Sequence, residues 1–220
     1  MVQARGLLLD IGGVVLRSGR EMFVPRARSE PALRDFVERT DLAGPGDDRW
    51  RAMIAHEITE RDYWEETAAA VGQELGQPDW HTRDLIVWLY HAPQAEWLVD
   101  EMVALMAEVK DAGIRMAALT NDLVDFHGQE WADEQRWLDL FDVVVDGSVT
   151  GVLKPDPSAY RLAVEAMGLP PGEIVYLDDM PVNVRGAAEA GLQAIEVLYA
   201  DRGRAMDEAR RRLGLSLVPV

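Results

Sequence analysis

Residues able to do chemistry follow short apolar runs at four places in the sequence. LLLDIGGVVL carries Asp10 and two glycines, ALTND carries Thr120, and GVLKPDPSAY carries Lys154. IVYLDD ends in the adjacent carboxylates Asp178 and Asp179. A carboxylate at a buried strand needs a partner, a metal ion or a place at the strand's end, because an unpaired one is costly to remove from water.

Together these side chains form the set that phosphoryl transfer requires. Such a site needs a nucleophile, a divalent cation, a fixed ammonium group and hydrogen-bond donors, because the reaction brings negative charges together. Asp178 and Asp179 repel each other unless a cation is present. Taken singly, the residues also have structural interpretations: Lys154 as a solvated loop residue, and Thr120 with Asn121 as a helix cap. The hypothesis therefore depends on the combination.

The elements that must position these residues alternate between strand and helix. Five apolar runs predict buried strands, at residues 5–10, 114–119, 141–146, 173–178 and 193–198. Capped or periodic segments predict helices over 95–112 and 157–168. This order predicts an α/β fold with a doubly wound, Rossmann-like parallel sheet, which binds ligands at the carboxyl ends of its strands. Asp10, Thr120 and Asp178 stand at that end of three runs, so we expect them to converge.

Residues 17–94 do not follow this alternation. They contain helical patterns such as PALRDFVERT and DDRWRAMIAHEI, separated by turn signals, and little that is typical of a strand. The sequence therefore predicts two domains. Residues 1–16 and 95–220 form the α/β core, and residues 17–94 form an inserted helical cap.

Composition limits the partners. The 220 residues are 48% hydrophobic, enough to bury a full core, and the net charge of −17 opposes binding to nucleic acid or anionic membranes. No apolar run reaches the roughly 18 to 20 residues that a membrane span needs. The absence of cysteine excludes disulfides and fits a reducing compartment. We therefore expect a cytoplasmic protein with no nucleic-acid or membrane partner, and the sequence leaves its oligomeric state open.

In this order, the four motifs resemble those of the haloacid dehalogenase-like hydrolases, most of which are magnesium-dependent phosphatases. The resemblance covers the whole predicted core, and the helical insertion lies where the family carries a small helical cap. It implies that Asp10 attacks phosphorus and forms an aspartyl-phosphate, which water then hydrolyses. It further implies Mg²⁺ as the cofactor and a small phosphorylated metabolite as the substrate.

The resemblance also implies roles for single residues. The implied catalytic residues are Asp10, Thr120 and Lys154. The implied phosphate-binding groups are the backbone N–H groups of Ile11 and Asn121 and the side chains of Thr120 and Lys154. The implied metal ligands are Asp10, the main-chain carbonyl of Gly12, Asp178 and Asp179.

Gly12 departs from the family's pattern. Phosphatases of the family usually carry a second aspartate there as general acid and base, a role worth about 10² to 10⁴ in rate. Without it, the leaving group departs as a stable anion or takes a proton from water or from a cap residue such as His56, Glu57 or Asp62. Two alternatives follow: a metal-independent haloacid dehalogenase, and a weakly active or non-catalytic binding protein. The paired carboxylates that end IVYLDD argue against the first.

Local positive charge or a metal ion has to attract an anionic substrate to so acidic a chain. Arg17 and Arg20 follow the first predicted strand near the start of the cap. We hypothesise that one of them attracts or orients the phosphorylated substrate, the alternative being that both are ordinary surface arginines.

Overall fold

The computed structural model describes residues 2–55 and 57–217. The chain divides into two compact units, one made of residues 1–16 and 98–220 and the other of residues 17–97. We call the first the core unit and the second the helical unit. The sequence placed the second junction at residues 94 and 95, three residues earlier.

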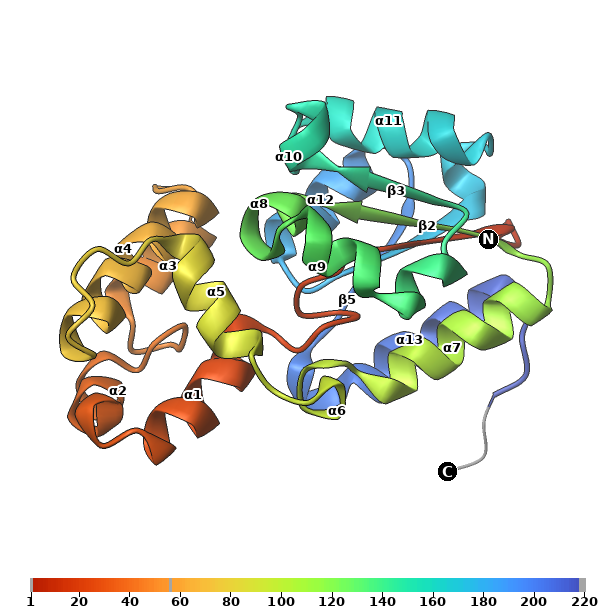
Figure 1. The fold of residues 1–220 in the computed structure, drawn as a ribbon. Coiled ribbons are helices and arrows are strands. Elements are labelled where there is room, and N and C mark those ends of the chain that lie inside the picture. The colour runs from red at the N-terminus through yellow and green to blue at the C-terminus, as the bar shows by residue number, and fades with distance from the viewer. Residues whose placement is uncertain (1, 56, 218–220) are drawn as a thin grey trace. The chain divides into compact units, whose positions relative to one another are not determined.

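A five-stranded parallel sheet forms the centre of the core unit (Figure 1). Its strands are β1 (Gly6–Leu9), β2 (Arg115–Thr120), β3 (Val143–Asp146), β4 (Ile174–Asp178) and β5 (Gln193–Glu196). Their spatial order is β3-β2-β1-β4-β5, so the sheet grows outward in both directions from β1. This confirms the predicted doubly wound α/β fold. β1 is shorter than expected and ends at Leu9, which places Asp10 just beyond the strand.

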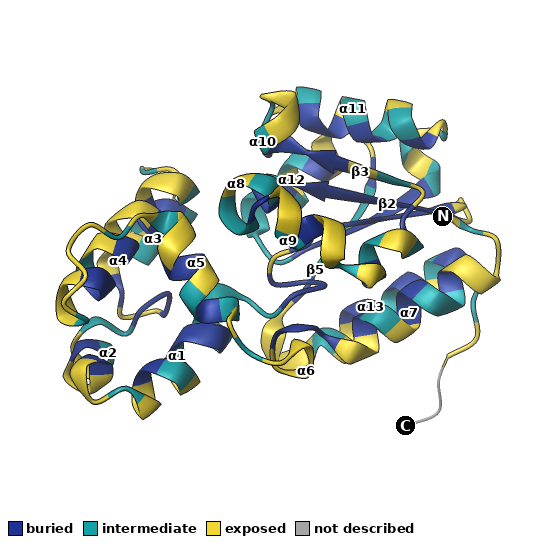
Figure 2. Cartoon of the chain, in the orientation of Figure 1, coloured by how far each residue is buried: buried dark blue, intermediate teal, exposed yellow. Residues whose placement is uncertain are grey.

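Helices cover both faces of the sheet. In Figure 1, α7 (Asp100–Asp111) and α13 (Arg202–Leu213) lie on one face, and α11 (Pro157–Met167) and α12 (Pro181–Glu189) lie on the other. Figure 2 shows that the strands between them are largely buried. Short helical segments complete the unit: α8 (Leu123–His127), α9 (Gln129–Glu134), η2 (Arg136–Leu140), α10 (Gly147–Thr150), η3 (Pro171–Glu173) and η4 (Tyr199–Asp201).

The helix expected over residues 95–112 is two helices, α6 (Gln94–Trp97) and α7. The break has a backbone cause. Val99 is extended and donates its N–H to the carbonyl of Val15 at 2.9 Å, and Leu98 forms an isolated antiparallel bridge with Leu16. The chain therefore pairs with the segment after β1 before α7 begins.

Every element in the described part of the helical unit is helical. The elements are α1 (Gly19–Ser29), η1 (Pro31–Leu33), α2 (Arg34–Thr40), α3 (Asp48–Ile54), α4 (Glu60–Glu74), α5 (Thr82–Tyr90) and α6. Capping boxes begin α1 at Ser18 and α4 at Thr59. Edge-to-face aromatic pairs fill its interior, for example Phe23 on Trp88.

Across residues 2–55 and 57–217, the helices are too short or too polar to cross a bilayer.

Candidate active site

The carboxyl edge of the sheet collects the polar residues that end the apolar runs. The N–H of Asp10 donates to the carbonyl of Leu177 on β4 at 2.9 Å, which fixes Asp10 beside that strand. Thr120 ends β2 and Asp178 ends β4. All three side chains belong to buried residues. The structure therefore places all three residues at the carboxyl edge of the sheet, and it shows Asp10 beside β4.

Lys154 bridges two of the buried carboxylates. Its Nζ lies 2.9 Å from Oδ1 of Asp10 and 2.8 Å from Oδ2 of Asp178, and its side chain is only 2% exposed. Burial alone lowers the pKa of Lys154, but the two carboxylates outweigh burial and raise that pKa above its ordinary value. Lys154 is therefore a fixed ammonium group at the strand ends.

Asp10 is oriented through one of its two carboxylate oxygens. Oδ1 accepts from Lys154 and, at 2.7 Å, from the N–H of Ile11. Burial raises the pKa of Asp10 to about 7 against the effect of Lys154, and Asp178 adds to the rise. A cation placed beside Asp10 would favour its ionised form. The N–H of Ile11, predicted to bind phosphate, points to the carboxylate of Asp10 here, and its phosphate role stays a prediction.

Asp178 is surrounded by donors. Oδ1 accepts from the N–H of Met180 at 2.8 Å, and Nδ2 of Asn183 lies 3.2 Å from both oxygens. Oδ2 also accepts from Lys154 and from the hydroxyl of Tyr176. Burial, followed by the neighbouring carboxylates, holds the pKa of Tyr176 well above its ordinary value, so its hydroxyl keeps its proton. These contacts fix both oxygens of Asp178, one of which binds Lys154.

Asp179 is half-buried and packs against the backbone of Gly13. Gly13 has a φ of +72°, and a Cβ built there would lie 2.0 Å from Oδ2 of Asp179. Glycine is thus required at position 13 by both its backbone conformation and the approach of the carboxylate. Gly12 differs: a Cβ there meets nothing within 4 Å, and its φ lies outside the left-handed region.

This contrast predicts that alanine at position 13 destabilises the protein and that alanine at position 12 does not. Gly13→Ala should lower the free energy of unfolding by at least about 1 to 2 kcal/mol, the cost of a left-handed residue with a Cβ, before any displacement of Asp179. Gly12→Ala should stay within about 0.5 kcal/mol of the wild type. Urea unfolding of both variants measures the difference. Equal stability of the two variants would contradict the backbone assignment.

The acidic cluster fits a divalent cation. Asp10, Asp178 and Asp179 each offer a carboxylate oxygen, and these atoms lie within 4.8 Å of one another. Carboxylate oxygen is the ligand type that Mg²⁺ prefers, and a cation would relieve the repulsion between the three groups. All three carboxylates are therefore candidate ligands.

A second layer of side chains joins the loops around Lys154. Asn121, which follows β2, accepts from the N–H of Lys154 at 2.7 Å and donates to its carbonyl at 3.2 Å. Asp146 ends β3, accepts from Val124 N–H at 2.9 Å, and caps α10 through Ser148. The side chain of Asn121 therefore positions the lysine loop, in addition to the backbone role that the resemblance implies.

The sequence interpretation missed Asp146, Asn183 and Tyr176. Asp146 carries the signal used for the other residues, a carboxylate that ends a buried run, and could have been found by it. Asn183 and Tyr176 carry no such signal, because their roles depend on tertiary contacts with Asp178.

Arg17 and Arg20 belong to the helical unit. Arg20 donates to the carbonyl of Asp41 at 3.0 Å and pairs with its carboxylate at 2.8 Å, which fixes the turn after α2. Nη1 of Arg17 lies 3.8 Å from a carboxylate oxygen of Glu21. Their role in substrate capture stays a prediction, and these contacts add a structural role for Arg20.

The structure describes two of the three candidate proton donors, Glu57 and Asp62. His56 lies outside the described residues. The carboxylate of Asp62 accepts from the hydroxyl of Thr59 at 2.6 Å and from its N–H at 3.1 Å, and these bonds hold the pKa of Asp62 below its usual range. Asp62 thus acts as a helix cap and is a poor proton donor. Glu57 is exposed, and its role as a donor stays a prediction.

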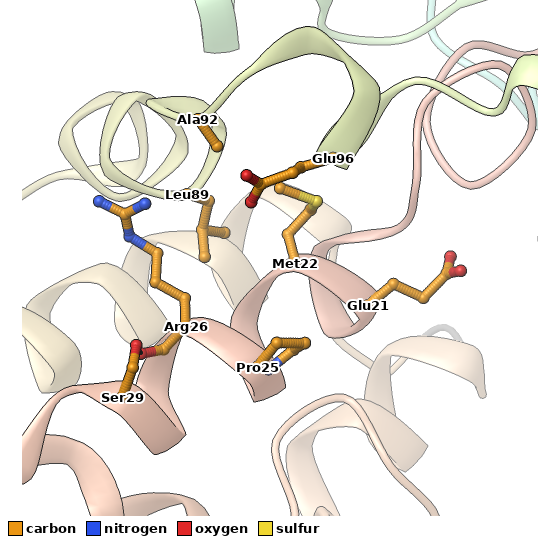
Figure 3. Close-up of a pocket in the computed structure, with 8 residues that line it drawn as sticks. All are labelled: Glu21, Met22, Pro25, Arg26, Ser29, Leu89, Ala92 and Glu96. Carbon is orange, nitrogen blue, oxygen red and sulfur yellow. Dashed lines mark hydrogen bonds between the residues drawn. The ribbon is translucent and has the colours of Figure 1, made fainter.

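The helical unit contains a pocket of about 250 Å³ between α1, α5 and α6 (Figure 3). Apolar side chains such as Leu89 line it together with Arg26 and Glu96. The guanidinium of Arg26 stacks 4.5 Å from the centre of the Trp88 ring and donates to the carbonyl of His91 at 3.3 Å. Within the described chain, this lining includes no predicted site residue.

A sequence model of the haloacid dehalogenase-like hydrolases matches residues 4–191. The chain belongs to this family of hydrolases, as its four motifs predicted. The match spans both units and includes every residue of the acidic cluster.

The chain resembles parts of longer curated proteins. Acyl-CoA dehydrogenase family member 10 of Mus musculus is 26% identical over 193 residues, 88% of this chain and 18% of that protein. Phosphoserine phosphatase of Thermus thermophilus is 31% identical over 132 residues, 60% of this chain and 51% of that protein. The chain therefore spans about a fifth to about half of the length of these relatives.

A solved structure shares the fold. The crystal structure of a HAD phosphatase from Thermococcus onnurineus matches with a TM-score of 0.62 at 21% identity, covering 97% of this chain and 100% of that one. At this identity, the match establishes the fold alone.

Proposed function

We propose that this hydrolase is a magnesium-dependent phosphatase that removes phosphate from a small phosphorylated metabolite through an aspartyl-phosphate on Asp10. The observation that carries the proposal is the buried bridge from Asp10 through Lys154 to Asp178, with Asp179 beside it. A nucleophile, an ammonium group and a carboxylate cluster that fits a cation are the parts that phosphoryl transfer needs. The resemblance of the chain to phosphoserine phosphatase supports the same class of substrate.

The proposed mechanism assigns each step to residues of the core unit. Among the described residues, Ile11 and Lys154 both donate to Oδ1 of Asp10. Oδ2 therefore keeps its lone pairs for phosphorus or a cation. Lys154 neutralises negative charge as the phosphoryl group approaches Asp10. The Thr120 hydroxyl and the N–H of Asn121 donate to the phosphoryl oxygens. Oδ2 of Asp10 bonds to phosphorus as the bond to the leaving group breaks and that group departs as an anion. A water molecule then attacks phosphorus and breaks the acyl-phosphate bond, which releases inorganic phosphate, passes the proton of the water to solvent and regenerates the Asp10 carboxylate.

The metal ion would be held by Asp10, the carbonyl of Gly12, Asp178 and Asp179. When bound, Mg²⁺ supplies charge stabilisation for the phosphoryl oxygens. Gly12 has no side chain that could protonate the leaving group. The substrate class favoured by this site is therefore one with a stable leaving anion, such as acyl or anomeric phosphates.

Phosphate release from esters of graded leaving-group pKa tests the proposal, with MgCl₂ or with EDTA. We expect release only with Mg²⁺, and kcat/KM that falls steeply as the leaving-group pKa rises. Gly12→Asp should raise kcat/KM for alkyl phosphates by about 10- to 100-fold, within the range of general acid catalysis, because the new carboxyl group can supply a proton. Gly12→Asn is the matched control, since it fills the same space without an acid.

Three outcomes would contradict the proposal. Halide release from 2-haloacids in EDTA would favour the dehalogenase alternative. Binding of phosphate without hydrolysis of any ester would favour the non-catalytic one. A flat dependence on leaving-group pKa in the wild type would show that another proton donor acts.

A further inference from the structure

The proposed chemistry gives the buried hydroxyl of Tyr176 no function. Tyr176 lies two residues before Asp178 on β4, so both side chains project from the same face of the strand. Its hydroxyl donates to Oδ2 of Asp178, the oxygen that also accepts from Lys154 at 2.8 Å. Lys154 in turn lies 2.9 Å from Asp10. Tyr176 is therefore joined to the nucleophile through three polar contacts in series.

Packing explains the ring of Tyr176 and leaves its hydroxyl unexplained. The ring lies edge-on to that of Tyr160, with centroids 6.1 Å apart, and both residues are fully buried. Phenylalanine would fill the same space but could not donate to Asp178. A buried hydroxyl needs a partner, and here the partner is the carboxylate that also binds Lys154.

Tyr176 and Lys154 donate to the same oxygen of Asp178, and this affects how strongly Asp178 attracts Lys154. Asp178 and Asp10 compete for the same ammonium group. A hydrogen bond from Tyr176 offsets part of the negative charge on Asp178, which weakens its attraction for Lys154. More of the positive charge then remains available to Asp10 and to a phosphoryl group bound there.

We propose that the Tyr176 hydroxyl is a positioning group that directs Lys154 toward the phosphoryl site by satisfying Asp178. The inference rests on the proposed phosphatase function, and it adds a residue that acts through Lys154 without touching the substrate. Outer-layer partners of this kind typically change activity or affinity by about 10- to 100-fold.

Tyr176→Phe tests the proposal, and Tyr160→Phe is the matched control. The Tyr160 hydroxyl is also buried but donates to the main-chain carbonyl of Asn183 at 2.9 Å. Calorimetry with inorganic phosphate in MgCl₂ should show affinity about tenfold weaker in Tyr176→Phe. The kcat should fall by a similar factor. Tyr160→Phe should keep both phosphate affinity and kcat.

Each other outcome overturns the inference. Unchanged phosphate affinity and kcat in Tyr176→Phe would show that the hydroxyl is dispensable. Equal losses in both variants would show a general structural effect. Phosphate binding does not require turnover, so this measurement still decides the role of Tyr176 if the wild type binds phosphate but hydrolyses no ester. A wild type that binds no phosphate overturns the inference together with the proposed function.

Discussion

Asp10→Asn is expected to abolish turnover while the protein stays folded. The amide has nearly the shape of the carboxylate, and its oxygen can still accept from Lys154 and Ile11, but it lacks the nucleophilic charge. Loss of a nucleophile of this kind costs on the order of 10⁴- to 10⁶-fold in kcat. Lys154 keeps its contact with Asp178 at 2.8 Å, so the protein should stay folded. Initial rates of phosphate release and thermal unfolding measure the two effects.

Asp201→Asn is the matched control for this substitution. Asp201 caps α13 by accepting from the N–H of Arg204 at 3.3 Å, and its side chain is 58% exposed. Asparagine caps helices as well as aspartate does, so activity and stability should be unchanged. Turnover in Asp10→Asn comparable with that of Asp201→Asn would remove the nucleophile assignment.

Lys154→Met is expected to have the largest effect on stability. It leaves the carboxylates of Asp10 and Asp178 buried without their shared cation. Removing one partner of a buried ion pair costs about 3 to 5 kcal/mol, and the lost charge should also reduce kcat by at least about 10²-fold. Urea unfolding in EDTA at a single pH measures the stability loss relative to the wild type.

Two further variants separate charge from packing at this site. The chain contains one other lysine, Lys110, whose side chain is 43% exposed, and Lys110→Met should change stability by less than about 0.5 kcal/mol. Adding Asp178→Asn to Lys154→Met removes one unpaired charge and should recover part of the stability without recovering activity. A Lys154→Met protein as stable as Lys110→Met would contradict the buried bridge.

Topology explains why part of the site could be predicted from the sequence. Parallel strands align their carboxyl ends, so apolar runs ending at Asp10, Thr120 and Asp178 place these residues together without knowledge of any side-chain contact. The prediction for Lys154 has a different basis. It lies in a loop, where periodicity carries no information, and only the resemblance of GVLKPDPSAY to a family motif indicated its role.

Other features depend on tertiary structure and could not be predicted. Gly12 and Gly13 are equivalent in the sequence, and only the backbone shows that Gly13 has a positive φ and faces Asp179 while Gly12 borders open space. Adjacent Asp178 and Asp179 likewise differ because Asn183 and the Tyr176 hydroxyl both reach Asp178. These distinctions arise from hydrogen-bond partners distant from any sequence motif.

The central claim is that Asp10 carries the phosphoryl group, and trapping that intermediate tests it most directly. Wild-type protein and Asp10→Asn would be mixed with an activated phosphate ester in MgCl₂, quenched in acid during turnover, digested and analysed by mass spectrometry. The account predicts an acyl-phosphate on the peptide that contains Asp10 in the wild type and none in the variant. Phosphorylation of a different residue, or phosphate release by the Asp10→Asn protein at the wild-type rate, would contradict it.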